Sequence, residues 1–373
     1  MLAPRPPRVA IIHEWLVMYA GSERALGGLL SLYPDADLYA LVDFLDDEDR
    51  AKLYNKRAKT SFLQRMPLVR TAYRNYLPLM PMAIEQFDLS SYDLVISNSH
   101  AAAKGVITGP NQRHICYCHS PARYAWDLQH QYLSQSRLTG GIKSALARMI
   151  LHYIRLWDTR TAPGVDLFVG NSAYIARRIQ KVYGRPAAVV HPPVDIDAFP
   201  LRLEKEDFYL AASRMVPYKR LDLIVEAFAA MPDKKLVVIG DGPEMGRIRR
   251  LATPNVTLLG YQEGPVLRDH LQRARAFIFA AEEDFGILPV EAQACGTPVI
   301  AFGKGGALDT VIDLNNQRGA APTGVFFGEQ TTAALIDAVT RFEAATISPA
   351  ACRAWAETFA LHHFQDAWRT AAQ

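Results

Sequence analysis

The sequence lacks several features by which other classes of protein are recognised. It contains four cysteines in 373 residues, and no two of them are spaced as Cys-x2-Cys, so a zinc site has little support. We expect these thiols to be buried and reduced, as in a cytosolic protein. The glycine pattern G-x-G-x-x-G with its partner acid is also missing, which disfavours a dinucleotide-binding dehydrogenase. The net charge of +3 is too small to indicate binding to nucleic acid.

Long apolar segments are missing as well. No apolar run approaches the ~20 residues that a membrane span needs, and the Pro/Arg-rich segment 1–8 has no apolar core of the signal-peptide kind. We therefore expect a cytoplasmic protein that reaches the inner face of the cytoplasmic membrane only by peripheral contact. With 50% hydrophobic and 21% charged residues, the chain is long enough for two globular domains with sizeable cores.

Short apolar runs alternate with helical stretches along the chain, which predicts parallel, doubly wound sheets. The alternation stops at Pro192-Pro193 and then restarts, so we place a domain boundary there. The expected strands are 8–13, 93–97, 113–118, 166–169, 187–191, 208–213, 235–240, 256–260, 276–281 and 298–302. The expected helices include 220–231, 287–295, 355–368 and one that opens at 21–26. The prediction is an α/β protein of two Rossmann-like domains, residues 1–191 and 192–355, facing across a cleft.

The most informative stretch runs from Glu283 to Glu291. An apolar strand leads into it, and a helix that starts near Ile287 leads out of it. Free backbone N–H groups at such a helix start bind anions. Glu283 precedes the turn and Glu291 lies about one turn into the helix, so one acid faces the helix mouth and the other reaches polar groups behind it. A phosphate with hydroxyls on both sides describes a nucleotide sugar.

The segment E-D-F-G-I-x-P-V-E-A resembles the E-x7-E signature of family 4, a large family of retaining glycosyltransferases with the GT-B fold. Other motifs extend the resemblance over nearly the whole chain. It implies that the C-terminal helix, 356–373, crosses back onto the first domain. It also implies that Glu283 contacts donor-sugar hydroxyls and that Glu291 contacts the ribose hydroxyls, with an exposed helix acid as the alternative for Glu291. The amides expected to face the sugar and phosphates belong to Gly286, Ile287 and Leu288.

A basic segment follows the first strand of the second half. Residues 213–220 match the family's R-x-x-P-x-K pattern, in which Arg214 and Lys219 bind the diphosphate. A leaving nucleoside diphosphate gains negative charge, and two fixed cations stabilise that charge without a metal ion. A solvated basic turn is the alternative.

Three further loops of the second half follow strands. Gly240-Asp241-Gly242-Pro243 resembles the family's G-x-G-P loop near the nucleotide, with a simple tight turn as the alternative. Tyr261 lies where family members hold the base. Residues 303–311 resemble G-x-G-G-x-x-E-T-V, with Asp309 in place of Glu. Their glycines allow either a close approach to the donor or only a loop.

The main signal of the first domain is C-Y-C-H-S-P-A-R-Y-A-W-D, residues 116–127. It resembles the signature Y-C-H-T-P-x-R-Y-x-W-D of the branch that builds bacterial exopolysaccharides and O-antigens, with Ser120 for Thr. His119 would be a catalytic residue near the donor-sugar hydroxymethyl group, with a structural histidine as the alternative. The residues expected on the acceptor side are Arg123, Tyr124, Trp126 and Asp127. Two of them, Tyr124 and Trp126, equally suit a core.

Two motifs follow the first strand of the chain. His13-Glu14-Trp15-Leu16 resembles the family's H-D-x-L, with Glu14 for Asp, and suits acceptor binding and structural support of the next loop equally well. That loop, residues 20–23, has alanine where the family commonly has a first glycine. Gly21 and Ser22, at the mouth of the following helix, are expected to let the donor phosphate approach the backbone.

These motifs predict a retaining hexosyltransferase that needs no metal or other cofactor. We expect GDP-mannose as the donor, because the resembling branch is rich in mannosyltransferases. The expected acceptor is a hydroxyl of a growing glycan linked to polyprenyl diphosphate. In the family, the leaving phosphate itself takes the acceptor's proton. The alternatives are a UDP-sugar transferase or nucleotide-sugar epimerase of the same fold, and a non-catalytic sugar-nucleotide-binding partner.

Two basic amphipathic stretches, 56–74 and 141–160, lie in the expected acceptor domain. Both mix Lys and Arg with large apolar residues, a composition that suits an anionic membrane surface. They predict peripheral docking that brings the protein to a lipid-linked acceptor. The alternative is an ordinary helix packed by its apolar face.

Overall fold

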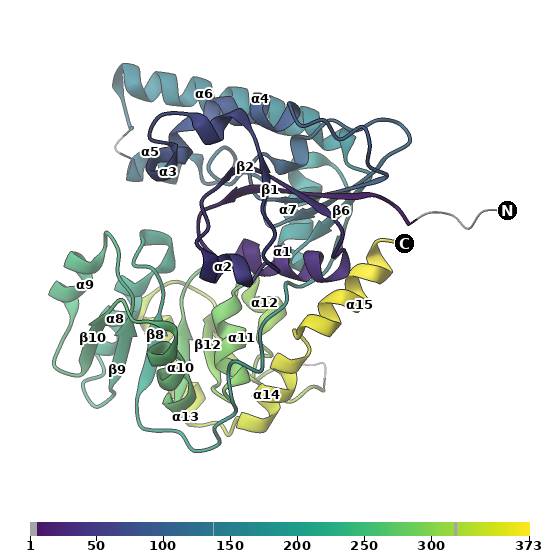
Figure 1. Ribbon diagram of the computed structural model, residues 1–373. Helices are drawn as coiled ribbons and strands as arrows, with labels where there is room; N and C mark the ends of the chain where they lie inside the picture. The colour runs from purple at the N-terminus through teal and green to yellow at the C-terminus, as the bar shows by residue number, and fades with distance from the viewer. Residues whose placement is uncertain (1–5, 137, 317–318) are drawn as a thin grey trace. The chain divides into compact units, whose positions relative to one another are not determined.

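The computed structural model of the chain describes residues 6–136, 138–316 and 319–373 (Figure 1). The first five residues of the Pro/Arg-rich segment lie outside this description. The chain divides into two compact units. The first unit contains the residues up to Pro192 together with Phe364–Gln373, and the second contains Pro193–His363.

The first unit is built on a sheet with the strand order β3-β2-β1-β4-β5-β6-β7, and its pairings among the described residues are parallel. The strands are β1 Val9–Leu16, β2 Asp37–Asp43, β3 Lys59–Thr60, β4 Leu94–Ser99, β5 Arg113–Cys118, β6 Leu167–Gly170 and β7 Ala187–Val189. The α-helices are α1 Gly21–Leu32, α2 Asp47–Ala51, α3 Val69–Ala72, α4 Met80–Glu85, α5 Gln129–Gln135, α6 Gly141–Thr161 and α7 Ala173–Tyr183. Short 3-10 turns are η1 Phe62–Arg65, η2 Tyr73–Leu79, η3 Ala103–Gly105 and η4 Ala162–Gly164.

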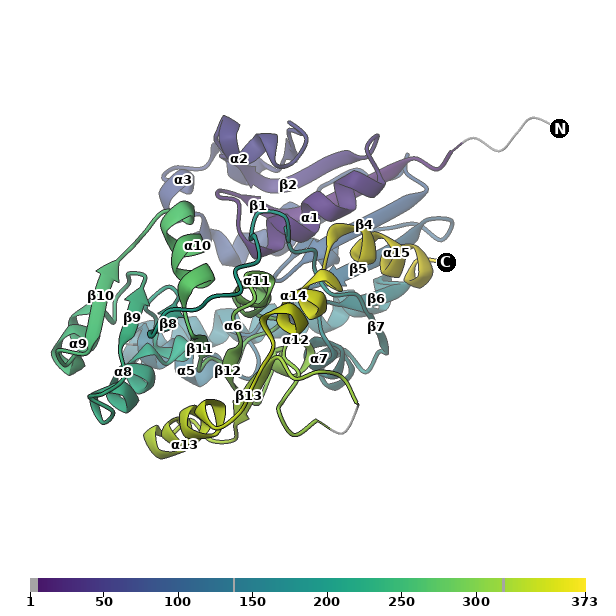
Figure 2. The same cartoon turned by 90° about the horizontal axis from the view of Figure 1, so that it is seen from below.

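The two faces of this sheet are covered by different helices. Ile11 of β1 packs in a buried cluster with α1, whereas its neighbours Ala10 and Ile12 join a cluster with α4 on the opposite face. Figures 1 and 2 show α1 on one side of the sheet and α6 on the other. A strand that is apolar on both faces is expected in a parallel sheet covered on both sides.

Helix α15 (Leu361–Ala371) joins the first unit near the C-terminus. Its residues Phe364 and Trp368 are buried in the cluster on the α1 side, and their ring centroids lie 5.9 and 6.1 Å from that of Tyr117. The indole nitrogen of Trp368 donates a hydrogen bond to the Tyr33 hydroxyl at 3.0 Å. The expected return of the C-terminal helix to the first domain is confirmed.

The second unit repeats the architecture, with the strand order β10-β9-β8-β11-β12-β13. Its strands are β8 Tyr209–Ala212, β9 Leu236–Ile239, β10 Val256–Gly260, β11 Ala276–Phe279, β12 Val299–Phe302 and β13 Gly324–Phe327. Its helices are α8 Leu221–Ala229, α9 Met245–Leu251, α10 Gly264–Arg273, α11 Ile287–Ala294, α12 Ala307–Thr310, α13 Thr332–Glu343 and α14 Pro349–Glu357, with the 3-10 turn η5 Pro217–Lys219.

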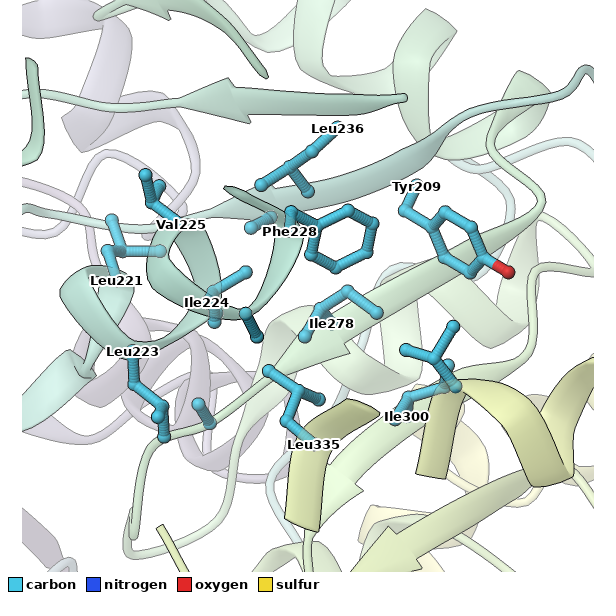
Figure 3. Close-up of a cluster of buried hydrophobic side chains, with 14 of the residues drawn as sticks. Tyr209, Leu221, Leu223, Ile224, Val225, Phe228, Leu236, Ile278, Ile300 and Leu335 are labelled. Carbon is cyan, nitrogen blue, oxygen red and sulfur yellow. The ribbon is translucent and has the colours of Figure 1, made fainter. Parts of the chain in front are cut away.

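One face of the second sheet is filled by aliphatic and aromatic side chains (Figure 3). Phe228 of α8 lies against Tyr209 of β8, with ring centroids 5.1 Å apart. Leu335 of α13 and Ile278 of β11 belong to the same buried cluster. This packing fixes the strands whose C-terminal ends carry the predicted motifs.

Three strands were not among those expected from the sequence: β2, β3 and β13. Strand β2 is a short apolar run after Pro34-Asp35, and periodicity alone does not separate such a run from part of a buried helix. Strand β3 has only two residues and β13 only four, so neither offers enough positions for a period to be visible.

The single helix expected over 355–368 is wrong. Helix α14 ends at Glu357 and α15 begins at Leu361. Between them, Phe359 is buried with its ring centroid 5.7 Å from that of Phe285, and its carbonyl accepts a hydrogen bond from the Val194 N–H at 2.9 Å. Phe359 occupies a position that one continuous helix would also bury. The spacing of apolar residues therefore gives no sign of the break.

The two basic stretches also differ from each other. Residues 56–74 are divided among β3, η1, α3 and the start of η2, whereas 141–160 lie within the continuous helix α6. Pro67 and Pro78 interrupt helical hydrogen bonding in and after the first stretch. Only the second stretch presents an uninterrupted helical face.

Candidate active site

The second unit brings two of the predicted site residues together. Strands β8 and β11 are neighbours at which the strand order reverses, the place where ligands bind in sheets of this kind. Lys219 lies in the loop after β8, and Glu283 lies in the loop after β11. The Lys219 ammonium group and the Glu283 carboxylate form an ion pair, with 18% and 19% of the two side chains exposed. The cation expected on the diphosphate and the acid expected on the sugar therefore share one position.

The backbone at Arg220 helps to fix this arrangement. Its φ of 55° is in the left-handed region, which is uncommon for a residue other than glycine, and it marks the change from η5 to α8. The Arg220 guanidinium donates to Oε1 of Gln330 at 3.1 Å. The Gln330 amide in turn donates to the Ala280 carbonyl at 2.8 Å, directly after β11. The loops that carry Lys219 and Glu283 are thus tied to each other.

Gly240 and Gly242 allow a close approach of two backbone segments. They have φ values of +139° and +152°, and a Cβ at these positions would lie 1.9 Å from the Ser213 carbonyl oxygen and 2.6 Å from that of Met215. Only glycine fits such a conformation and such a contact. The Met215 N–H also donates to the Asp241 carbonyl at 2.8 Å. The glycine loop therefore seats the segment that carries Arg214, which is more than a simple turn.

Helix α11 presents its N-terminus at the same edge of the sheet. Gly286 precedes it with a φ of +91°, and no side chain among the described residues caps the helix. The backbone N–H groups of Ile287 and Leu288 therefore lack a capping acceptor, as is usual for the first turn of a helix. Glu291, farther along the helix, is 4% exposed, so it is not the exposed helix acid of the alternative interpretation.

The glycines of residues 303–311 support the turn that carries the acid. The Gly306 N–H donates to the Glu283 carbonyl at 2.8 Å. A Cβ at Gly305 would lie 2.4 Å from that same carbonyl oxygen, and a Cβ at Gly306 would lie 2.3 Å from the Cα of Phe285. The close approach that these glycines permit is therefore to the backbone of the turn itself.

Two predicted residues project from this edge without such support. Arg214 is exposed, and none of its side-chain contacts within the described part of the chain is a hydrogen bond or an ion pair. Tyr261 is 75% exposed and follows β10. With Lys219 and the α11 amides, Arg214 gives the edge two cations and a helix N-terminus, which is an arrangement that binds anions.

The first unit carries a chain of hydrogen bonds at its own switch point, between β1 and β4. Nε2 of His119 lies 2.7 Å from the amide oxygen of Asn98. The amide nitrogen of Asn98 donates to Nδ1 of His13 at 3.0 Å and to the Ser22 carbonyl at 2.9 Å. Nε2 of His13 completes the chain at 3.0 Å from the Glu23 carboxylate.

The orientation of the Asn98 amide fixes where the protons lie. Because an amide oxygen only accepts, Nε2 of His119 carries a proton and Nδ1 of the neutral ring is an acceptor. Burial, together with the nearby His100 and His13, lowers the pKa of His119 to about 3. At neutral pH, His119 therefore offers a lone pair to a hydroxyl group.

His13 supports the loop that precedes α1. The Glu23 carboxylate that accepts from His13 also accepts from the Ala20 N–H and the Ser22 hydroxyl, both at 3.0 Å. Burial alone raises the pKa of Glu23, but the hydrogen bond and electrostatic interaction with His13 bring it down to about 2. Ala20 has an ordinary φ of −135°, so alanine needs no strain here. Gly21 and Ser22 begin α1 at this mouth.

Glu14 supports a different loop from the one suggested by the sequence. Its fully buried carboxylate accepts hydrogen bonds from the backbone N–H groups of residues 100–103, at 2.8 to 3.1 Å, and from the Ser99 hydroxyl at 3.0 Å. Burial by itself raises the pKa of Glu14, but His100 and these amides lower it below its usual value. We therefore assign Glu14 to the loop after β4 and leave it out of the proposed acceptor site.

The predicted acceptor-side residues lie in the turn after β5: Arg123, Tyr124, Trp126 and Asp127. The Trp126 indole donates to the carboxylate of Asp158, in α6, at 2.7 Å, which gives this side chain a structural contact. Asp127 is exposed and forms an ion pair with Arg178 of α7. Tyr124 packs beside Tyr132, with ring centroids 6.4 Å apart.

Sequence reasoning missed Asn98 and His100. Asn98 is a buried residue near the C-terminal end of β4, and His100 directly follows that strand. Polar residues at a strand end are the signal that led to His119. The His100 ring centroid lies 6.3 Å from that of His119 and 4.7 Å from that of Trp15. The segment S-N-S-H at the end of β4 could therefore have been found by the same rule.

Two family models match the chain. Residues 41–198 match the model described as Glycosyltransferase Family 4, and residues 195–358 match the model described as Glycosyl transferases group 1. The chain therefore belongs to glycosyltransferase family 4.

Curated relatives include two mannosyltransferases. The GDP-mannose-dependent monoacylated alpha-(1-6)-phosphatidylinositol monomannoside mannosyltransferase of Corynebacterium glutamicum is 34% identical over 178 residues, which are 39% of this chain and 47% of the relative. The matched segment thus spans about half of that relative's length. The alpha-1,3/1,6-mannosyltransferase alg2 of Schizosaccharomyces pombe is 23% identical over 91% of this chain and 76% of its own.

Among solved structures, Anabaena HepE in complex with UDP and glucose aligns with a TM-score of 0.68. The alignment covers 98% of this chain and 99% of HepE at 15% sequence identity. At this identity the likeness concerns the fold alone. It confirms the expected GT-B fold over nearly the whole chain.

Proposed function

We propose that the protein transfers a mannosyl group from GDP-mannose, with retention of configuration, to a hydroxyl of a lipid-linked glycan in cell-surface polysaccharide biosynthesis. The observation that carries the proposal is the pairing of Lys219 with Glu283 beside the start of α11. A cation, a carboxylate and free helix amides at one switch point match the diphosphate and hydroxyl groups of a nucleotide sugar.

The charges of the second unit would act on the leaving group. When the bond between the anomeric carbon and the diphosphate oxygen breaks, the diphosphate gains negative charge that Lys219 and Arg214 stabilise. The acceptor oxygen forms the new bond to the anomeric carbon, and its proton passes to the leaving phosphate. Glu283 would bind donor-sugar hydroxyls, and Glu291 would bind the ribose hydroxyls. These steps need no metal ion, so treatment with EDTA should leave the rate unchanged.

The first unit would bind the sugar hydroxyls through uncharged side chains. His119 offers an acceptor atom whose direction Asn98 fixes, which suits a hydroxyl such as that of the hydroxymethyl group. Gly21 and Ser22, at the start of α1, would approach the donor phosphate. Arg123, Tyr124 and Asp127 remain the proposed acceptor side, with Trp126 as structural support for that turn.

The identity of the donor rests on the relatives. Both mannosyltransferases named above support a mannosyl donor, and the name of the bacterial one specifies GDP-mannose and a monoacylated phosphatidylinositol monomannoside. A lipid-linked acceptor, here polyprenyl diphosphate, would place the protein at the inner face of the cytoplasmic membrane. A UDP-sugar donor is the second candidate, because HepE, which shares the fold, was solved with UDP and glucose.

Thermal denaturation with GDP, UDP or ADP tests the proposal. We expect GDP alone to raise the melting temperature, by a few degrees at concentrations well above its Kd. A shift with UDP alone would keep the site but replace the donor. If no nucleotide shifts the melting temperature, the proposed function fails and a non-catalytic role is favoured.

A further inference from the structure

Helix α6 has two apolar faces, only one of which is packed. Leu151, Ile154 and Trp157 are buried against the first unit. The opposite face carries five large apolar side chains that are 46% to 90% exposed: Ile142, Leu146, Met149, Tyr153 and Leu156. We call these five residues the α6 stripe. An ordinary amphipathic helix would carry polar residues there.

The spacing of the α6 stripe makes it one continuous surface. Steps of three and four residues keep the side chains on one side of a helix, and the stripe extends over ~20 Å at the helical rise. In Figures 1 and 2, α6 lies on the side of its sheet opposite α1. None of the described helices is long and apolar enough to cross a membrane. An exposed apolar stripe of this length suits a helix that lies in the plane of an interface.

The charges of α6 select the kind of partner. Its exposed charged residues are all cations: Lys143, Arg148 and Arg160. Its only acid, Asp158, is buried in an ion pair with Lys104 at 3.0 Å. A second copy of the chain docked through the same helix would bring like charges together, whereas anionic lipid headgroups would complement them.

We propose that the α6 stripe docks the first unit on an anionic membrane surface. The stripe would enter the boundary between headgroups and acyl chains, and the three cations would contact the headgroups. This surface goes beyond the proposed transfer reaction, because neither the donor nor the chemistry depends on it. Residues 56–74 are not needed for it, since their broken backbone offers no comparable face.

Flotation with phosphatidylglycerol-containing vesicles tests the proposal. The protein should float at low salt, and less so at high salt or with vesicles of phosphatidylcholine alone. The double substitution Leu146→Ser/Met149→Ser should weaken partitioning on the order of tenfold or more. The matched control Ile107→Ser/Leu203→Ser removes two side chains that are each 63% exposed elsewhere, and it should float like the parent. The substitution Lys143→Glu/Arg148→Glu should remove most of the salt dependence.

Three results would overturn the docking proposal. They are no flotation of the parent chain, equal flotation of the stripe variant and its control, and a dimer in solution that the stripe variant dissociates. GDP binding without vesicles, measured on the same proteins, separates the two proposals. Loss of flotation with intact GDP binding defines the stripe as the docking surface, whereas absence of GDP binding in the parent would contradict only the proposed donor.

Discussion

The carboxyl ends of the two sheets have the same strand order around their switch points but opposite chemistry. In the first unit, His119, Asn98 and His13 are joined by short hydrogen bonds and are largely buried. In the second, Lys219 and Glu283 are partly exposed and form an ion pair, while Arg214 is exposed to solvent. A fixed neutral network suits the recognition of hydroxyls, and adaptable charges suit a diphosphate whose charge changes during reaction.

The largest effect should come from removing the cation of the second unit. Lys219→Ala should lower the rate of mannosyl transfer on the order of 100- to 1,000-fold, because the leaving diphosphate loses a fixed positive charge. Initial rates with GDP-mannose measure this. The control is Lys234→Ala in the same unit. This lysine lies outside the proposed site, and its ammonium group is 2.9 Å from the Glu343 carboxylate. Equal rates for the two variants would remove Lys219 from the mechanism.

Replacing the acid of the same pair should separate binding from turnover. Glu283→Gln should slow transfer roughly 10- to 100-fold, because a charged acceptor for sugar hydroxyls is lost. The affinity for GDP should stay the same or increase, since Lys219 no longer shares its charge with a carboxylate. Calorimetric titration with GDP measures this, with Glu357→Gln as a control acid outside the site. A parallel loss of GDP affinity would contradict the separation.

In the first unit, Asn98→Ala should cost less, roughly tenfold in kcat, because His119 is retained but no longer oriented. The pH profile distinguishes positioning from mere stability. The pKa of His119 is lowered to about 3, so its protonation should not limit activity above pH 5. Asn98→Asp places a carboxylate beside the ring and raises that pKa, so activity should decline at a higher pH as the solution is acidified. If the parent protein and Asn98→Asp lost activity at the same pH on acidification, a role for the neutral His119 ring would be contradicted.

The smallest effect concerns stability rather than turnover. Gly240→Ala forces a side chain into a φ of +139° and against the Ser213 carbonyl, and it should lower the free energy of unfolding by about 2 kcal/mol or more. Gly246→Ala lies inside α9, where the nearest atom is 3.9 Å from the new Cβ, and should raise it by about 0.5–1 kcal/mol. Urea denaturation of both variants tests whether the glycine loop seats the Arg214 segment.

The fold was largely accessible from the sequence because strand ends in such sheets coincide with changes in composition. The apolar run before Glu283 and the helix after Gly286 could be located by pattern alone. Strands β3 and β13 are too short for a period to show, and the break at Phe359 keeps its buried side chain in phase with the helices.

The site was harder to predict from the sequence, because its hydrogen bonds and ion pairs join residues that are far apart in the chain. The sequence suggests His13 and Glu14 as one motif, yet neighbouring positions of a strand face opposite sides of the sheet. His13 therefore meets Glu23 on one side, and Glu14 meets residues 100–103 on the other. The pairing of Lys219 with Glu283 also requires β8 and β11 to be neighbours in the sheet. That depends on the order of the strands, which the spacing of the motifs does not give.

The most direct test of the proposed roles of His119 and Lys219 is the ratio of affinity for GDP-mannose to affinity for GDP, measured by calorimetry on two variants. Lys219→Ala should weaken both ligands together and leave the ratio nearly unchanged. Asn98→Ala should lower the ratio, because the proposed contact of His119, which Asn98 orients, is to a sugar hydroxyl that GDP lacks. If Asn98→Ala weakened GDP as much as GDP-mannose, or if Lys219→Ala changed only the ratio, the proposed roles of His119 on the sugar and of Lys219 on the diphosphate would be contradicted.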